Sequence, residues 1–325
     1  MKKIICALLA ALMLLSFAAC GSTADKTPTE KTDVNVFTLK GPTGMGMAKL
    51  TEKDSSEYNN YNITLSAQPT ELAGLIANGS VDIAACPLNL AAALYKKTNG
   101  AIKLVGINTL GVLYILENGS TVTDIASLKG KTIYASGQGA TPEYALNYLL
   151  EKNGLDKDKD VEIIWKSEHS EVATLMATGE AQIALLPEPN VTAVMTKNTN
   201  VRIAVDITKE WEKVSDTQFA MGCIIATKSF AEEHPDALKA FLEDYKRSVV
   251  AVNLNTDEIC ELIASNGIVP SAAVAKEAIP NCNIVLITGD EMKKIAVGNF
   301  EVLLNADPKS IGGALPDENL YYVEK

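Results

Sequence analysis

One phrase occurs twice in this chain, and it constrains the fold more than any other feature. ELAGLIANGSVDIAACP spans residues 71–87, and EVATLMATGEAQIALLP spans residues 171–187. Eight of the 17 positions are identical, including Gly79 with Gly179 and Pro87 with Pro187. Each copy has a helical pattern that stops at the glycine and continues into a short apolar strand. The repeat predicts two lobes of similar construction.

The elements around the repeat follow the same order twice. Short apolar strands alternate with helical patterns over about residues 33–110 and again over about residues 120–208, and each run opens with a strand and a glycine-rich turn. Such alternation is typical of βαβ units, in which largely parallel sheets are covered by helices on both faces. From residue 229 onward the pattern is helical. We therefore expect an α/β fold with two βαβ lobes.

Two apolar, strand-like stretches stand where the chain passes between these runs. They are LGVLYILEN (residues 110–118) and FAMGCIIATK (residues 219–228). If both stretches pass from one lobe to the other, the C-terminal helices return to the first lobe, and the two connecting ribbons form a hinge. The expected boundaries are residues 33–112 and 219–325 for lobe 1 and residues 113–218 for lobe 2.

The N-terminus has the pattern of an export signal. Two lysines precede an apolar run that ends in SFAAC, which is similar to a bacterial lipobox with Cys20 as the lipidated residue. We expect a signal peptide at residues 1–19 and a lipidated tether at residues 20–32; the alternative is an ordinary secretory signal with a chance cysteine. Cleavage removes both lysines and brings the formal net charge from −11 to about −13, which argues against nucleic-acid partners.

The remaining cysteines and histidines do not form a metal-binding pattern. Four cysteines of the body stand in apolar or helical contexts without a CxxC pair, so we expect free thiols that act as small hydrophobic residues: Cys86, Cys223, Cys260 and Cys282. The chain has two histidines, neither beside a cysteine or in a metal-ligand spacing with the other. No GxSxG or comparable nucleophile motif is present. We expect no metal, no cofactor and no catalytic residue.

Ligands of open parallel sheets bind beyond the carboxyl ends of the strands. Four loops stand at such positions: residues 41–46 (GPTGMG), 86–89 (CPLN), 136–142 (SGQGATP) and 187–190 (PEPN). Glycine lets the backbone approach a ligand, and the helix starts behind these loops offer unpaired N–H groups. Neither glycine loop has the spacing of a nucleotide-binding fingerprint, and tight strand-to-helix turns are the alternative.

The side chains near these loops are mostly neutral. Arg202 and Arg247 are the two arginines and lie outside the loops, so a bidentate clamp for a carboxylate is not expected. The candidate polar contacts are Thr43, Asn89, Asn108, Ser136, Gln138, Thr141, His169, Glu188 and Asn190. For Glu188 the alternative is an acidic first-turn residue that favours the helix dipole, and for His169 it is plain surface. Trp211 is a candidate wall of the cleft.

Four segments together resemble a known family: SFAAC (16–20), PTELAGLIANGSVDIAACP (69–87), LKGKTIYASGQGATPEYALNYLLEKNGL (128–155) and EVATLMATGEAQIALLPEP (171–189). The chain resembles the lipoprotein substrate-binding components of bacterial ABC importers, in the group for nitrate, sulfonates, taurine and thiamine-precursor pyrimidines. The likeness covers nearly all of residues 33–300. It implies a type 2 periplasmic-binding-protein fold, with two βαβ lobes joined by a two-ribbon hinge and a ligand cleft between them.

Carried over by position, the contacts of that family fall on residues 44–46, 87–89 and 137–141 and on Glu188. With the residues found above, the expected ligand-binding set is Thr43, Gly44, Met45, Gly46, Pro87, Leu88, Asn89, Asn108, Gly137, Gln138, Gly139, Ala140, Thr141, His169 and Glu188. Many relatives have an aromatic residue beside the acidic residue of the PEP segment, whereas this chain has prolines on both sides of Glu188. The cysteine-rich signature of the pyrimidine-phosphate synthases is also absent, so the ligand cannot be carried over.

The resemblance further implies a protein that performs no chemistry, and we expect it to be a monomer. It would capture a small polar or anionic molecule and deliver it to an ABC permease and its ATPase. The protein would lie on the extracytoplasmic face of the cell membrane, held by the lipid on Cys20 alone. Two alternatives stay open: an enzyme on the same two-lobed fold, of the dehydratase or menaquinone-pathway type, and a lipid-anchored ligand sensor.

Overall fold

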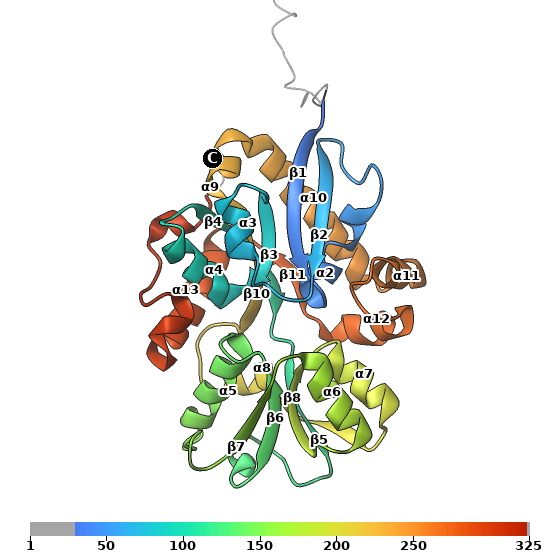
Figure 1. The fold of residues 1–325 in the computed structure, drawn as a ribbon, viewed down its shortest axis with the longest axis vertical. Coiled ribbons are helices and arrows are strands. Elements are labelled where there is room, and N and C mark those ends of the chain that lie inside the picture. The colour runs from blue at the N-terminus through green and yellow to red at the C-terminus, as the bar shows by residue number, and fades with distance from the viewer. Residues whose placement is uncertain (1–29, 324–325) are drawn as a thin grey trace, which may run out of the picture. The chain divides into compact units, whose positions relative to one another are not determined.

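The computed structural model describes residues 30–323, which form two sheets with helices on their faces (Figure 1). The expected signal peptide, Cys20 and most of the tether lie outside the described residues. We call the part built on the six-stranded sheet lobe 1 and the part built on the five-stranded sheet lobe 2. In the described residues, no helix is both long enough and apolar enough to span a membrane.

The sheet of lobe 1 has the strand order β11-β4-β10-β3-β1-β2. Its strands are β1 (Thr32–Leu39), β2 (Asn59–Ser66), β3 (Ile83–Pro87), β4 (Ile102–Leu110), β10 (Ala220–Thr227) and β11 (Ile284–Ile287). The sheet of lobe 2 has the order β7-β6-β8-β5-β9. Its strands are β5 (Leu113–Asn118), β6 (Thr132–Ser136), β7 (Glu162–Lys166), β8 (Ile183–Pro187) and β9 (Val201–Asp206).

The two sheets are built to one plan. The order β2-β1-β3-β10-β4 in lobe 1 corresponds strand by strand to β7-β6-β8-β5-β9 in lobe 2. In both sheets a strand from outside the βαβ run of that lobe is inserted between the last two strands of the run: β10 lies between β3 and β4, and β5 lies between β8 and β9. The predicted duplication is therefore confirmed, and it extends to the topology of the sheets.

The expectation of largely parallel sheets was wrong in one respect, because both sheets are mixed. Strand β5 runs antiparallel to β8 and β9, and β10 runs antiparallel to β3 and β4. The reason is the direction from which the chain enters each lobe. Strand β4 ends at the cleft and β5 starts three residues later, so β5 has to run away from the cleft while β6 and β8 run toward it.

The lobe 1 helices are α2 (Pro42–Met45), α3 (Leu72–Ala77), α4 (Leu88–Lys97), α9 (Lys228–Glu233), α10 (Pro235–Asn253), α11 (Asp257–Ser265), α12 (Ala272–Ala278) and α13 (Gly289–Ala306). Those of lobe 2 are α5 (Thr141–Lys152), α6 (His169–Thr178), α7 (Asn190–Lys197) and α8 (Ile207–Glu212).

The C-terminal segment was expected to be helical throughout, yet Ile284–Ile287 forms β11 on the edge of the first sheet, beside β4. A four-residue apolar strand is too short to show a period of its own.

Each copy of the repeated phrase folds as a helix and the strand that follows it. Gly79 and Gly179 both have positive φ, of 71° and 80°, and stand at the ends of α3 and α6. The helices bury Leu72 and Val172 at matching positions. The identical residues of the repeat thus serve helix termination and packing on the sheet.

Apolar residues cover both faces of each sheet. In β5, Leu113 and Ile115 belong to one core cluster and Tyr114 and Leu116 to the cluster on the opposite face. This alternation with both sides buried is what a strand enclosed by two helical layers requires. Trp211, expected at the cleft, belongs to the core instead: it is 1% exposed, and its ring stacks on another aromatic side chain at 4.8 Å.

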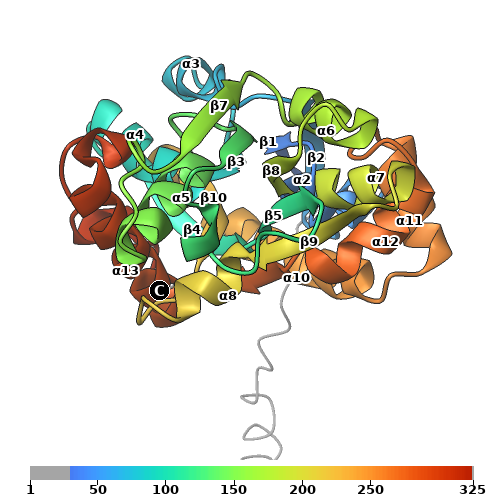
Figure 2. The same cartoon turned by 90° about the horizontal axis from the view of Figure 1, so that it is seen from below.

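Within the described residues the chain passes between the lobes at two places. The first is the link between β4 and β5, at residues 111–112, and the second is the segment between α8 and β10, at residues 213–219. The strands of lobe 1 lie within residues 32–110 and 220–287, and those of lobe 2 within residues 113–206. Helices from the two lobes also meet, α5 beside α13 and α7 beside α12 (Figure 2).

Candidate functional site

A cleft of about 690 Å³ lies between the two lobes. Several of its residues end strands that run toward it: Leu39 ends β1, Pro87 ends β3 and Pro187 ends β8. This is the position at which open α/β sheets bind ligands. The full lining is Leu39, Lys40, Gly41, Pro42, Thr43, Ala67, Pro87, Thr109, Val112, Glu168, His169, Ser170, Pro187, Glu188, Pro189, Asn190, Met221, Gly222, Ala264, Gly267, Ile268, Val269 and Pro270.

The loop after β1 supplies one wall of the cleft, although its later glycines point elsewhere. Gly41 has φ 89° and lines the cleft with Thr43. A side chain on Gly44 would come within 2.4 Å of a backbone oxygen, and one on Gly46 within 2.2 Å of the Tyr245 hydroxyl. These two glycines are therefore required for close packing within lobe 1.

Other predicted contacts from lobe 1 also lie beneath the cleft surface. Met45 and Leu88 are core residues, and Asn108 is fully buried. A side chain on Gly222, which does line the cleft, would meet the Asn108 Oδ1 at 2.5 Å. Of the predicted contacts in lobe 1, the structure brings Thr43 and Pro87 to the cleft.

The glycine-rich loop of lobe 2, at residues 137–141, does not line this cleft, and its last residue contacts lobe 1. Thr141 donates a hydrogen bond from its Oγ1 to the Asn89 Oδ1 at 3.2 Å, and both side chains are buried. The Gly139 N–H donates to a carboxylate of Glu143 at 2.7 Å. Of the predicted contacts outside this cleft, Thr141 and Asn89 therefore meet at a contact between the lobes, whereas Gln138 and Gly139 are exposed and Gly137 and Ala140 are half-buried.

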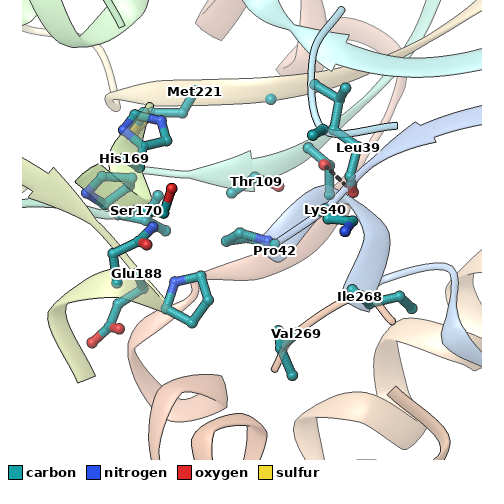
Figure 3. A pocket seen from close by; sticks show the side chains of 18 of the residues that line it. Leu39, Lys40, Pro42, Thr109, His169, Ser170, Glu188, Met221, Ile268 and Val269 are labelled. Atoms are coloured by element: carbon teal, nitrogen blue, oxygen red, sulfur yellow. Dashed lines mark hydrogen bonds between the residues drawn. The ribbon is translucent and has the colours of Figure 1, made fainter. Parts of the chain in front are cut away.

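His169 is the first residue of α6 and lines the cleft. Figure 3 shows His169 and Ser170 on one side of the pocket and Leu39, Lys40 and Ile268 on the other. The His169 Nδ1 lies 2.5 Å from the Ser136 Oγ, which fixes the ring. Burial lowers the pKa of His169, so its imidazole is neutral at neutral pH. The ring can therefore offer a neutral hydrogen-bonding group to a ligand.

Glu188 lies at the cleft, but its carboxylate is turned to the first turn of α7. Its two oxygens accept hydrogen bonds from the backbone N–H and the hydroxyl of Thr192, each at 3.1 Å. The side chain is 2% exposed, and burial raises the pKa of Glu188 to about 7. The carboxyl group of Glu188 is thus partly protonated at neutral pH.

The cleft carries little formal charge. Lys40 is the one lysine among the lining residues, and no arginine lines the cleft within residues 30–323. Arg202 instead pairs with the buried Glu117 at 2.5 Å, and Arg247 pairs with Asp244 on its own helix. Glu168 and Glu188 are the acidic residues of the lining, which is otherwise dominated by prolines and aliphatic side chains, with hydroxyl, imidazole and amide groups among them.

Sequence reasoning missed the wall that comes from residues 264–270. This loop joins α11 to α12 and brings Ile268, Val269 and Pro270 to the cleft. The Gly41 N–H donates to the Ile268 carbonyl at 3.1 Å, which ties the loop to the end of β1. A glycine and a proline bracketing apolar residues were the available signal, but they mark a turn and not a site.

No group of three or more histidine, cysteine or acidic side chains in the described residues is arranged to hold a metal ion.

The lobes are joined across the cleft by polar contacts. In addition to Thr141 with Asn89, the Gln68 Nε2 donates to the Glu168 Oε1 at 2.9 Å, and the Tyr114 hydroxyl lies 3.5 Å from the Asn281 carbonyl. Three hydrogen bonds thus link lobe 1 to lobe 2.

Solved structures with the same fold were found among transport proteins. An ABC transporter protein from Parabacteroides distasonis has a TM-score of 0.77 at 24% identity, covering 91% of this chain and 100% of that chain. The periplasmic aliphatic sulphonate binding protein SsuA from Escherichia coli has a TM-score of 0.73 at 15% identity, covering 91% of this chain and 94% of that chain. These likenesses confirm the predicted periplasmic-binding-protein fold.

Sequence comparison places the chain in a family. A relative named "Putative binding protein YtlA", from Bacillus subtilis (strain 168), is 24% identical over 258 residues, which are 77% of this chain and 74% of that protein. The family described as "NMT1/THI5 like" matches residues 61–258, from β2 through α10 into α11. The chain belongs to the NMT1/THI5-like family.

Proposed function

We propose that this chain is the solute-binding protein of an ABC importer, which encloses a small molecule between its lobes and delivers it to a permease. The cleft is the observation that carries this proposal. At about 690 Å³, it has the size of small-molecule sites, and loops from both lobes line it. A ligand that touches both lobes stabilises the closed arrangement by its differential affinity for that state.

The lining indicates the kind of ligand. Prolines and aliphatic residues form most of the walls, while the neutral His169 and the start of α6 offer hydrogen-bond donors at one side. With Lys40 set against Glu168 and Glu188 in the lining, the cleft is suited to a neutral or singly charged head group on an apolar body. The relative SsuA is named for aliphatic sulphonates, which combine these two features.

We propose that the protein performs no reaction on this ligand. Ser136 and His169 are placed like a nucleophile and its base, at 2.5 Å. However, Ser136 is 1% exposed and does not line the cleft, so its hydroxyl cannot reach a bound molecule in this arrangement. Incubation with any identified ligand, followed by mass spectrometry, would reveal turnover if the enzyme alternative holds.

We further propose a lipid on Cys20, a position on the extracytoplasmic face of the membrane and a monomeric state. The support is the SFAAC motif and the polar segment after it. Labelling with a radioactive fatty acid should mark the wild-type chain and not the Cys20→Ala variant. Detergent-phase partitioning should separate the same two proteins, and light scattering should give the mass of one chain.

The function itself is tested by a thermal-shift screen of sulfonates, pyrimidines, vitamins and small anions. A true ligand at 100 times its Kd adds about 2.7 kcal/mol to the free energy of unfolding. Met221→Trp should fill the cleft and abolish this gain, whereas Ile203→Trp, on the outer surface of lobe 2, should preserve it. Binding that survives Met221→Trp would place the ligand elsewhere and contradict the proposal.

A further inference from the structure

Two cysteines that are far apart in the sequence touch in the sheet of lobe 1. Cys86 in β3 and Cys223 in β10 stand directly opposite each other, and their Sγ atoms are 3.9 Å apart. Both residues are 0% exposed and belong to the same core cluster. The other two body cysteines lie apart from this pair, Cys260 on α11 and Cys282 after α12.

The backbone at this pair suits a covalent link. Directly opposite residues of antiparallel strands have Cα atoms about 4.5 or 5.5 Å apart. Both values fall within the range of about 4.4–6.8 Å that disulfides use. The two side chains lie on the same face of the sheet, so the sulfur atoms have to approach by about 1.9 Å to reach bonding distance.

We propose that Cys86 and Cys223 form a cross-strand disulfide when the chain meets a disulfide-bearing oxidant. One thiolate attacks the oxidant disulfide and releases one of its sulfurs as a thiol. The second cysteine then attacks this mixed disulfide and releases the other. The protein loses two protons and two electrons, and the oxidant disulfide becomes two thiols.

Burial determines when this exchange takes place. Burial raises the pKa of Cys223, and the thiolate is the reactive form, so the folded sheet protects the pair. The exchange therefore occurs during folding, before β10 has paired with β3. Once the two strands have paired, the buried disulfide is protected from reduction. Pro87 and Gly222, which adjoin the two cysteines, line the cleft, so the bond holds two strands of the cleft floor together.

The test is peptide mapping of the full chain after refolding. The protein is unfolded in urea with reductant, refolded in a buffer of oxidised and reduced glutathione, then denatured and alkylated. We expect a single cross-linked peptide pair that joins Cys86 to Cys223, with Cys260 and Cys282 alkylated. Cys260→Ser should give the same pair, whereas Cys86→Ala should leave Cys223 alkylated or bound to glutathione.

A second measurement reports whether the bond suits the native fold. The cysteines are 137 positions apart, and a loop of this length predicts a rise of the unfolding midpoint of roughly 5–10 °C relative to the reduced protein. Alkylation of all four body cysteines, Cys86 and Cys223 included, after refolding in the glutathione buffer would overturn the proposal. A bond to Cys260 or Cys282, or a lowered unfolding midpoint, would overturn it as well.

Discussion

Gln68 and Glu168 meet across the cleft, with the Gln68 Nε2 donating to the Glu168 Oε1 at 2.9 Å. They are 100 positions apart, and each lies three residues before its copy of the repeated phrase. Equivalent points of the two lobes therefore face each other. This relationship follows from two lobes of one topology whose strand ends point toward a shared cleft.

Loss of this contact should favour an open arrangement of the lobes. In Gln68→Ala the exposed hydrogen bond is lost, so the free energy of unfolding should change by less than about 1 kcal/mol. The radius of gyration from small-angle X-ray scattering should increase. Gln182→Ala is the matched control, because Gln182 bonds only within lobe 2, and it should leave the radius unchanged.

Thr141→Val should destabilise the protein more than the loss of an exposed contact. The substitution removes the hydroxyl that bonds the Asn89 Oδ1 and leaves that oxygen buried beside a methyl group. Leaving a buried acceptor unpaired costs about 1–3 kcal/mol, measurable by urea unfolding. Thr174→Val, on an exposed face of α6, should stay within about 0.5 kcal/mol of the wild type. Equal losses for both variants would show that the contact between the lobes contributes nothing.

Two glycine-to-alanine substitutions should change the free energy of unfolding in opposite directions. Gly222→Ala places a methyl group 2.5 Å from the Asn108 Oδ1 and 3.0 Å from Thr43, so overpacking should cost about 1–3 kcal/mol and weaken ligand binding. Gly74→Ala, in the exposed part of α3, meets no atom within 4 Å. Its lower backbone entropy in the unfolded chain should stabilise the protein by about 0.5–1 kcal/mol. Thermal unfolding of both variants checks the two signs.

Glu188 should make the protein less stable as the pH rises. Its pKa is raised from 4.5 to about 7 in the folded state, so the folded chain binds the proton more tightly than the unfolded chain. The free energy of unfolding should therefore fall between about pH 4.5 and 7, by up to about 3 kcal/mol. Glu188→Gln keeps the side-chain shape and should remove this slope.

The comparison with wild type isolates Glu188 from other titrating groups. His169 acts in the opposite sense, because its lowered pKa costs stability as the pH falls. The difference between Glu188→Gln and wild type cancels that contribution. Glu180→Gln, at an exposed position, is the control for the removal of one surface carboxyl group. A difference that does not vary with pH would contradict the predicted role of burial.

The architecture could be predicted from local patterns. Gly79 and Gly179 end their helices in the left-handed region, as the repeat indicated, and α10 lies in the segment after residue 229 that was expected to be helical. Such features depend on residues a few positions apart, which a sequence displays directly. The direction of β5 and β10 could not be predicted in the same way, because it depends on the side from which the chain enters each lobe.

The site could be predicted only in part. The predicted contacts that line the cleft are Thr43, Pro87, His169 and Glu188. By contrast, Gly46 is a glycine because a side chain there would collide with the Tyr245 hydroxyl. The Thr141 hydroxyl is hydrogen-bonded to Asn89. A glycine that approaches a ligand and a glycine that approaches a buried side chain look the same in a sequence. The wall at residues 264–270 belongs to a helical segment far from the repeat, with no pattern that assigns it to the cleft.

By itself, the sequence determined the class of fold, the duplication and the glycine- and proline-containing loops at the carboxyl ends of the strands. Hydrophobic period and glycine position encode these locally. Tertiary structure alone decided which loop faces the cleft, and that Cys86 touches Cys223 across 137 positions. The physical reason is that both results depend on β10 pairing between β3 and β4, and pairing between distant segments is set by the packing of the whole lobe.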